Sequence, residues 1–120
     1  MILVVDDEAT IRSLTGSILR QAGYEVHEAG SGEEALRMLE AEIRQPNLLL
    51  TDIVMPGVNG LTLAARIHHS YPDLGVLFMS GYASEYEDEL SGSICLQKPF
   101  KPAQLLAAVE DVLRARAHTH

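Results

Sequence analysis

The chain has 120 residues, of which 47% are hydrophobic and 22% charged, a composition typical of one globular domain with its own core. Its formal net charge of -8 argues against direct nucleic-acid contact, because phosphate backbones are bound by clustered Lys and Arg. The single cysteine, Cys95, excludes an intrachain disulfide and favours a reducing, cytoplasmic compartment. The sequence has no apolar stretch long enough to span a membrane and no basic leader, which predicts no membrane contact by this segment.

Five short apolar runs of strand length recur along the chain. The first, third and fourth are continuously apolar, which predicts strands covered on both faces, as in a parallel sheet. The second and fifth runs are more mixed and suit the edges of a sheet. In chain order, the runs span residues 2–5, 24–27, 48–51, 75–79 and 94–97.

Amphipathic helices are predicted after the first two runs, over 10–22 and 31–43. Ser31 followed by Glu34 is typical of a capping box at the start of the second helix. The apolar stripe of the first helix comprises Ile11, Leu14, Ile18 and Ala22, and that of the second comprises Ala35, Met38, Leu39 and Ile43.

Three further helices follow the remaining runs. The third spans 61–69 and ends before Pro72, the fourth, over 84–90, is weak and strongly acidic, and Pro102 opens a clear fifth. Five strands alternating with five helices predict a doubly wound α/β fold with a five-stranded parallel sheet. Such sheets bind ligands at the carboxyl ends of their strands.

Polar side chains stand at four of those strand ends. Asp6 and Asp7 follow the first strand, Asp52 ends the third, Ser80 the fourth and Lys98 the fifth. Carboxylates that converge in one crevice repel each other unless a cation neutralises them, and hard oxygen ligands suit Mg²⁺. An ionised Asp52 can then attack phosphorus as a nucleophile, with Lys98 and the metal neutralising the phosphoryl oxygens and Ser80 supplying a hydroxyl donor.

Four segments carry a resemblance to a known family: residues 4–8 (VVDDE), 51–60 (TDIVMPGVNG), 79–81 (MSG) and 98–100 (KPF). Together they resemble a response-regulator receiver domain (CheY-like) over residues 1–116, with a polar tail at 117–120. The resemblance implies a flavodoxin-like (βα)5 fold with strand order 2-1-3-4-5. It also implies Mg²⁺-dependent phosphoryl transfer to Asp52 from a histidine kinase or histidine phosphotransfer domain, in a domain that promotes its own phosphorylation and dephosphorylation.

Position by position, the resemblance implies that Asp7, Asp52 and the backbone carbonyl of Val54 ligate Mg²⁺, with Asp6 acting through water. It implies a cis peptide bond between Lys98 and Pro99. The phosphoryl group would switch the surface of the fourth and fifth helices, and a homodimer through the fourth helix, fifth strand and fifth helix is compatible with it. Residues 78–82 and 96–100 are similar to receivers of hybrid sensor histidine kinases, and a stand-alone regulator stays open beside that reading.

Cys95 departs from the family pattern, which usually has Tyr or Phe at this position. A thiol cannot reorient as an aromatic ring does, so we predict that phosphorylation is transmitted through the loop after Ser80 and the acidic fourth helix. The alternative for Cys95 is an inert, small apolar residue. His68 and His69 are expected on a solvated helix end.

Each motif, taken alone, can also be explained by local backbone structure without any functional site. The acids at 6–8 suit a helix N-terminus, and Ser80 with Gly81 suits a plain turn. Among functions, a degenerate receiver that only mediates protein contacts and an aspartyl-nucleophile phosphatase remain as alternatives. A flavodoxin-like mononucleotide carrier is disfavoured because its first loop would have to bind phosphate where this chain has three acids.

Overall fold

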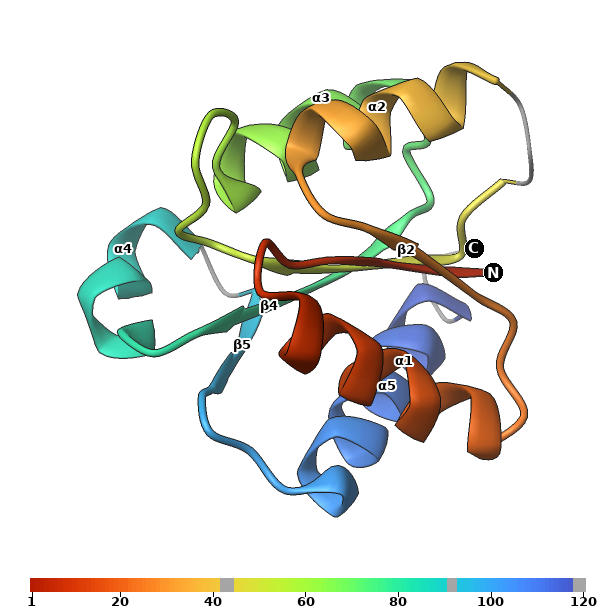
Figure 1. The fold of residues 1–120 in the computed structure, drawn as a ribbon, viewed down its shortest axis with the longest axis vertical. Helices are drawn as coiled ribbons and strands as arrows, with labels where there is room; N and C mark the ends of the chain where they lie inside the picture. Colours follow the sequence, from red (N-terminus) through yellow and green to blue (C-terminus); the bar gives the residue numbers. More distant parts are fainter. Residues whose placement is uncertain (42–44, 91–92, 118–120) are drawn as a thin grey trace.

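The computed structural model describes residues 1–41, 45–90 and 93–117. Strands and helices alternate along the chain as predicted (Figure 1). The elements are β1 (Ile2–Val5), α1 (Ala9–Gln21), β2 (Val26–Ala29), α2 (Gly32–Glu40), β3 (Leu48–Asp52), α3 (Gly60–Ser70), β4 (Gly75–Ser80), the 3-10 helix η1 (Ala83–Tyr86), α4 (Glu87–Leu90), β5 (Ile94–Gln97) and α5 (Pro102–Ala117).

The five strands form one parallel sheet in the order β2-β1-β3-β4-β5. This confirms the predicted doubly wound fold and strand order, with the two mixed runs at the edges. Figure 1 shows α2 and α3 covering one face of the sheet, and α1 and α5 the other. The carboxyl ends of the strands therefore meet at one edge, beside α4.

Alternate residues of the central strands feed two separate core clusters, because successive side chains of a strand point to opposite faces. Leu3 and Leu49 belong to the cluster under α2 and α3. Ile2 and Leu48 belong to the cluster under α1 and α5. Burial on both faces explains why these strands are continuously apolar in sequence.

The second strand begins two residues later than predicted. Gly23 has a φ of 100°, and the Tyr24 N–H donates to the carbonyl of Leu19 at 3.1 Å. These features belong to the turn that ends α1, and a positive φ is natural for glycine there. The apolar ring of Tyr24 packs on the core cluster from this turn, which is why the sequence pattern placed it in the strand.

The apolar stripe predicted for the first helix is not its buried face. Leu14 is 60% exposed and Ala22 is exposed, whereas α1 buries Thr15, Gly16 and Leu19. Gly16 faces the side chain of Glu28 on β2, and a Cβ there would stand 2.6 Å from one of its carboxylate oxygens. The buried side of α1 thus combines two small residues with Leu19, whereas Leu14 and Ala22 of the predicted stripe lie at the surface.

Half of the predicted capping box of α2 is present, because its second hydrogen bond reaches Gly30 and not the N-cap residue Ser31 itself. Ser31 Oγ accepts a hydrogen bond from the Glu34 N–H, and Glu34 Oε2 accepts one from the Gly30 N–H, both at 3.0 Å. The helix ends at Glu40, and Ile43, predicted to extend its stripe, lies outside the described residues. Ala35 and Leu39 are buried as that stripe requires.

The C-terminal elements follow the prediction with two differences. The weak fourth helix is divided into η1 and α4 of four residues each. α5 runs through Ala117, one residue into the predicted polar tail, and His118 and His120 lie outside the described residues. Within the described ranges, no helix combines the length and apolarity needed to cross a bilayer.

Candidate functional site

Two buried carboxylates lie at the carboxyl ends of neighbouring strands. Asp6 follows β1, Asp52 ends β3, and these strands pair directly. Asp6 is 0% exposed and Asp52 7% exposed. Carboxylates are rarely this buried unless they are paired with a positive charge. Asp6 and Asp52 therefore indicate a site in which a nearby cation compensates their charge.

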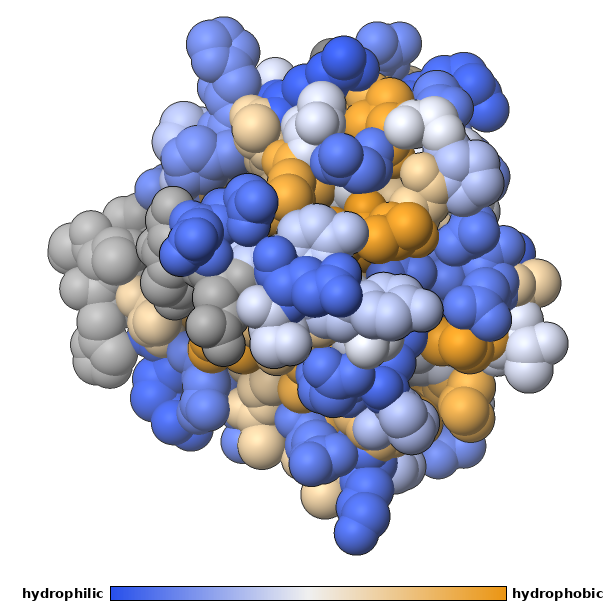
Figure 2. All heavy atoms as spheres, turned by 90° about the vertical axis from the view of Figure 1, so that its left-hand side faces the viewer, coloured by the Kyte–Doolittle hydropathy of each residue, from blue (hydrophilic) through white to orange (hydrophobic). Residues whose placement is uncertain are grey.

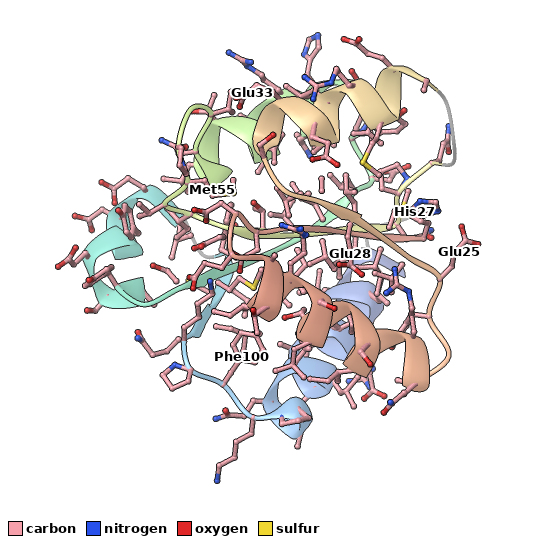
Figure 3. All side chains as sticks on the ribbon, viewed as in Figure 1. Glu25, His27, Glu28, Glu33, Met55 and Phe100 are labelled. Carbon is pink, nitrogen blue, oxygen red and sulfur yellow. The ribbon has the colours of Figure 1, made fainter. Side chains whose placement is uncertain are left out.

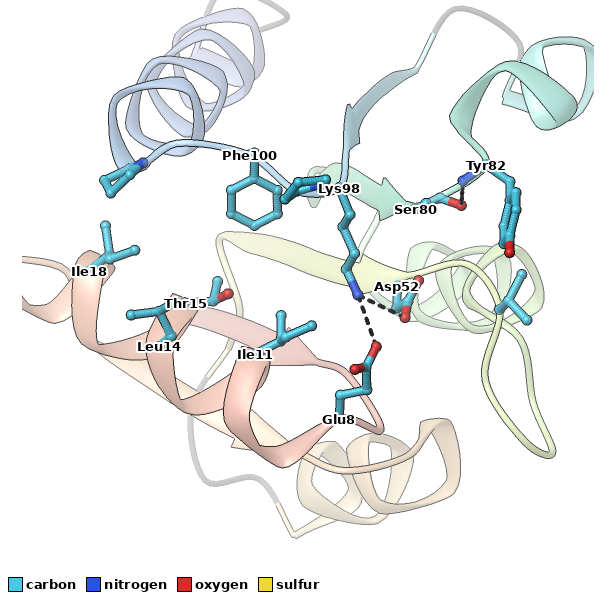
Figure 4. A pocket seen from close by; sticks show the side chains of 14 residues that line it. Glu8, Ile11, Leu14, Thr15, Ile18, Asp52, Ser80, Tyr82, Lys98 and Phe100 are labelled. Atoms are coloured by element: carbon cyan, nitrogen blue, oxygen red, sulfur yellow. Dashed lines mark hydrogen bonds and ion pairs between the residues drawn. The ribbon is translucent and has the colours of Figure 1, made fainter.

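Lys98 provides the positive charge. Its Nζ donates to Asp6 Oδ2 at 2.8 Å and to Asp52 Oδ2 at 3.1 Å, and lies 4.0 Å from Glu8 Oε1. Figure 4 shows the lysine side chain reaching from the end of β5 toward Asp52 and Glu8. The Lys98–Pro99 peptide bond is cis, as the resemblance implied.

Burial raises the pKa of Asp52 above its ordinary value, and the nearby charge of Asp6 adds to this, while the hydrogen bond and charge of Lys98 act in the opposite direction. For Lys98, burial lowers the pKa, but its hydrogen bonds to Asp6 and Asp52 outweigh this, so that its pKa is raised. The lysine is therefore held in its charged form. Ionisation of the Asp52 carboxyl therefore costs stability in the metal-free protein, and such perturbed groups are common at functional sites.

Three carboxylates lie close enough together to hold a cation. Oxygens of Asp6, Glu8 and Asp52 all lie within 4.8 Å of one another. Asp7, which the resemblance predicts as a metal ligand, is exposed. It does not belong to this cluster of three carboxylates, which was identified among the described residues. The sequence predicts Glu8 as part of the 4–8 motif and as a helix-capping acid, not as a ligand, yet as the N-cap of α1 its side chain makes no capping hydrogen bond. Its place directly after the acidic pair was the available signal.

Ser80 lies in the same pocket, as predicted. It ends β4, is 1% exposed, and its Oγ accepts a hydrogen bond from the Tyr82 N–H at 2.9 Å. The exposed side chains of Val54 and Tyr82 also line this pocket. The Ser80 hydroxyl is thus hydrogen-bonded to the main chain of the loop that follows β4.

The loop between β3 and α3, which carries Val54, is closed from both sides. The Gly60 N–H donates to the Ile53 carbonyl at 2.8 Å, and the Val58 N–H donates to Glu33 Oε1 at 3.1 Å. Figure 3 shows Glu33 at the start of α2 and Met55 in the loop on the same side of the sheet, where Met55 is buried in the core. These contacts fix the main chain around Val54.

A second brace holds the main chain at Asp6. The guanidinium of Arg12 donates to the Asp6 carbonyl at 2.7 Å and lies 3.8 Å from Glu28, whose other carboxylate oxygen binds Arg20 at 2.7 Å. Figure 3 places Glu28 between β2 and α1. The sequence pattern gave no signal for this network, because it joins separate elements.

The pocket that contains Asp52 has a volume of about 650 Å³ and extends along α1 as an apolar groove. Ile11, Leu14 and Ile18 form one wall, and Phe100 lies across from them (Figure 4). Pro102 also lines the groove. Figure 2, which faces the carboxyl ends of the strands, shows apolar patches among the hydrophilic side chains. Three residues of the apolar stripe predicted for this helix thus form the wall of a groove that leads to Asp52.

Cys95, His68 and His69 do not line the pocket that contains Asp52. Cys95 is partly buried against the cluster under α2 and α3, which Tyr86 also contacts. Burial raises the pKa of its thiol, with a further contribution from the charge of Asp52. His68 and His69 are exposed in the last turn of α3, as expected.

Comparison with known proteins connects this geometry to a family. A family model described as the response regulator receiver domain matches residues 2–110. The chain is 35% identical over 119 residues to a sensor kinase, CckA of Brucella abortus, covering 93% of this chain and 12% of the kinase. It covers 48% to 56% of four transcriptional regulators that it also matches.

Solved structures give the same result. A CheY-like receiver domain protein of Methanospirillum hungatei has a TM-score of 0.87 and 32% identity, covering 99% of this chain and 97% of that one. The response regulator TrrA of Thermotoga maritima, solved with Mg²⁺-BeF, has a TM-score of 0.82 and 33% identity, covering 92% of this chain and 96% of that one. The chain therefore belongs to the response regulator receiver domains of two-component signalling systems.

Proposed function

We propose that Asp52 accepts a phosphoryl group from the phosphohistidine of a histidine kinase or histidine phosphotransfer domain, in a Mg²⁺-dependent reaction in the cytoplasm. The observation that carries this proposal is the buried Asp52 carboxylate at the end of β3, bound to Lys98 and beside two further carboxylates. The TrrA structure with Mg²⁺-BeF is of a similar domain and supports the same chemistry.

The donor set fits Mg²⁺. Asp6, Glu8 and Asp52 bring three hard oxygen ligands together against one lysine, which leaves a negative excess for a divalent cation to balance. Asp7 and the Val54 carbonyl, implied by the resemblance, remain further candidate ligands. When bound, the ion would neutralise the phosphoryl oxygens.

The chain's own residues then have distinct roles. A carboxylate oxygen of Asp52 forms a bond to phosphorus while the P–N bond of the phosphohistidine breaks, its electron pair returning to the imidazole. The Lys98 ammonium, already 3.1 Å from Asp52, neutralises charge on the transferred group. Ser80 donates its hydroxyl to the attached phosphoryl group.

The groove along α1 suits the phosphoryl donor. Any protein that presents a phosphohistidine to Asp52 must cover the mouth of the pocket, where Leu14, Val54 and Tyr82 are exposed. A helical donor surface with apolar residues would bury these side chains. The phosphorylated state would then change the surface of α4 and α5, and Ile94, 39% exposed on edge strand β5, is available to a homodimer there.

The alternatives are less well supported. The described site retains Asp6, Asp52, Ser80 and Lys98 together, whereas a degenerate receiver has no need of this arrangement. An aspartyl-nucleophile phosphatase typically has a second acid two residues after the nucleophile, and this chain has Val54 there.

The test is intact mass spectrometry after incubation with acetyl phosphate and Mg²⁺. We expect one phosphoryl group on the wild type, none on Asp52→Asn and none with a chelator. Asp111→Asn, at an exposed aspartate of α5, is the matched control and should be modified like the wild type. An unmodified wild type that still binds Mg²⁺, tested also with a phosphorylated histidine phosphotransfer protein, would contradict the proposal.

A further inference from the structure

Gln97, the last residue of β5, uses every polar atom of its side chain to join three separate points of the main chain. Its Nε2 donates to the carbonyl of Gly81 at 2.8 Å and to that of Lys98 at 2.9 Å. Its Oε1 accepts from the Ala83 N–H at 3.3 Å. Two carbonyls face the nitrogen and one N–H faces the oxygen, so these partners fix the orientation of the amide.

Two of those points flank Tyr82, whose N–H donates to Ser80 Oγ. Gln97 therefore holds the loop that the Ser80 hydroxyl is bound to. Among the described residues, no side-chain hydrogen bond joins Ser80 to Asp52 or Lys98. A hydroxyl that turns toward a phosphoryl group on Asp52 must either draw this loop with it or lose its bond to Tyr82.

We propose that Gln97 is a positioning residue that latches the loop after Ser80 in its resting position and so opposes the phosphorylated arrangement. This inference rests on the proposed function of Asp52. It also gives a physical route for transmission in a chain with Cys95 in place of the usual aromatic residue. Because Gln97 is exposed, its hydrogen bonds are exchangeable with water and weak enough to be released on phosphorylation.

The latch has a thermodynamic signature that a purely structural contact lacks. A ligand that prefers the released loop binds more tightly when the resting loop is destabilised. Removing two hydrogen bonds of ordinary strength from the loop shifts this equilibrium by on the order of tenfold. Loss of the latch should therefore raise the affinity for a phosphoryl mimic while lowering the stability of the ligand-free protein.

The experiment compares Gln97→Leu and Gln97→Met with the wild type, the second variant keeping the unbranched stem. Affinity for beryllofluoride at saturating Mg²⁺ is measured by calorimetry, and Tm is measured without metal. Gln104→Leu is the matched control, because Gln104 is also an exposed glutamine that accepts a hydrogen bond from a backbone N–H, at Lys101, but does not touch the loop.

We expect about tenfold tighter beryllofluoride binding and a lower Tm in the Gln97 variants, with wild-type affinity in Gln104→Leu. Affinity that stays unchanged, or that falls together with Tm, overturns the latch and leaves the proposed function intact. A wild type that binds Mg²⁺ but not beryllofluoride overturns the proposed function, and the latch with it.

Discussion

Gly60→Ala should separate the geometry of the phosphoacceptor from the stability of the fold. Gly60 begins α3, and a Cβ there would stand 2.1 Å from the carbonyl oxygen of Asp52. Real Cβ atoms essentially never come within 3.0 Å of such an atom, so Asp52 or the helix must move by about 0.9 Å. Misplacement of a reacting group by about 1 Å costs roughly 100-fold in rate.

The assay is the rate of Asp52 phosphorylation by acetyl phosphate at saturating Mg²⁺, followed by intact mass, with urea unfolding of the same protein. We expect a rate loss of roughly 100-fold and destabilisation of about 1–3 kcal/mol, the usual cost of overpacking. The control is Leu63→Ala on the same helix, where a fully buried side chain is lost at a cost of roughly 2–5 kcal/mol.

Leu63→Ala should be as unstable as Gly60→Ala, or more so, yet keep a nearly wild-type rate, because no backbone atom of the site moves. The reasoning is refuted if Gly60→Ala reacts within a few-fold of the wild-type rate. It is equally refuted if Leu63→Ala loses as much activity, since the effect would then follow stability and not geometry.

Three further predictions concern Asp52, Cys95 and Leu14. In metal-free protein, Asp52→Asn should raise Tm at neutral pH, because burial raises the pKa of the folded carboxyl and its ionisation opposes folding; the gain should disappear as the pH falls below the unfolded pKa of about 3.9. Cys95 should react with iodoacetamide more slowly than a free cysteine at pH 8, since burial raises its thiol pKa, and urea should restore the rate. Leu14→Gln should slow transfer from a phosphorylated histidine phosphotransfer protein about tenfold more than transfer from acetyl phosphate, because the exposed leucine lines the groove.

Each of these has a contradicting result. A lower Tm for Asp52→Asn at neutral pH would mean that the Lys98 pair outweighs burial. Alkylation of folded protein as fast as that of free cysteine would contradict the burial of Cys95. Equal slowing with both phosphoryl donors would assign Leu14 to the chemistry instead of to donor docking.

Residues whose surroundings are set by strand burial were predicted well. The continuous apolar character of β1, β3 and β4 comes from helices that cover both faces of the sheet. Polar residues stand at the ends of these strands, where the chain leaves the core. The sequence therefore predicts that Asp6, Asp52, Ser80 and Lys98 meet at one edge of the sheet, because each directly follows or ends a recognisable strand, and the structure places them there.

Features that depend on close approach between elements were not predicted. Hydrophobic periodicity selects the apolar stripe through Leu14, but the buried residues of α1 are Leu19 and the small Thr15 and Gly16, which such a stripe does not include. Gln97 and Glu33 are single polar residues whose partners lie far along the chain. Nothing local distinguishes them from ordinary solvated side chains.

The pairing of Lys98 with Asp6 and Asp52 has a consequence for biosynthesis. The lysine is 92 residues from one partner and 46 from the other, so its charge is made available only after almost the whole domain has been translated. A nascent chain that stops before β5 would bring two carboxylates together at the edge of β1 and β3 without their cation, which is costly in a buried setting. Neutralisation of Asp6 and Asp52 is thus coupled to the docking of β5. Fragments that end before β5 should collapse without forming the pocket around Asp52.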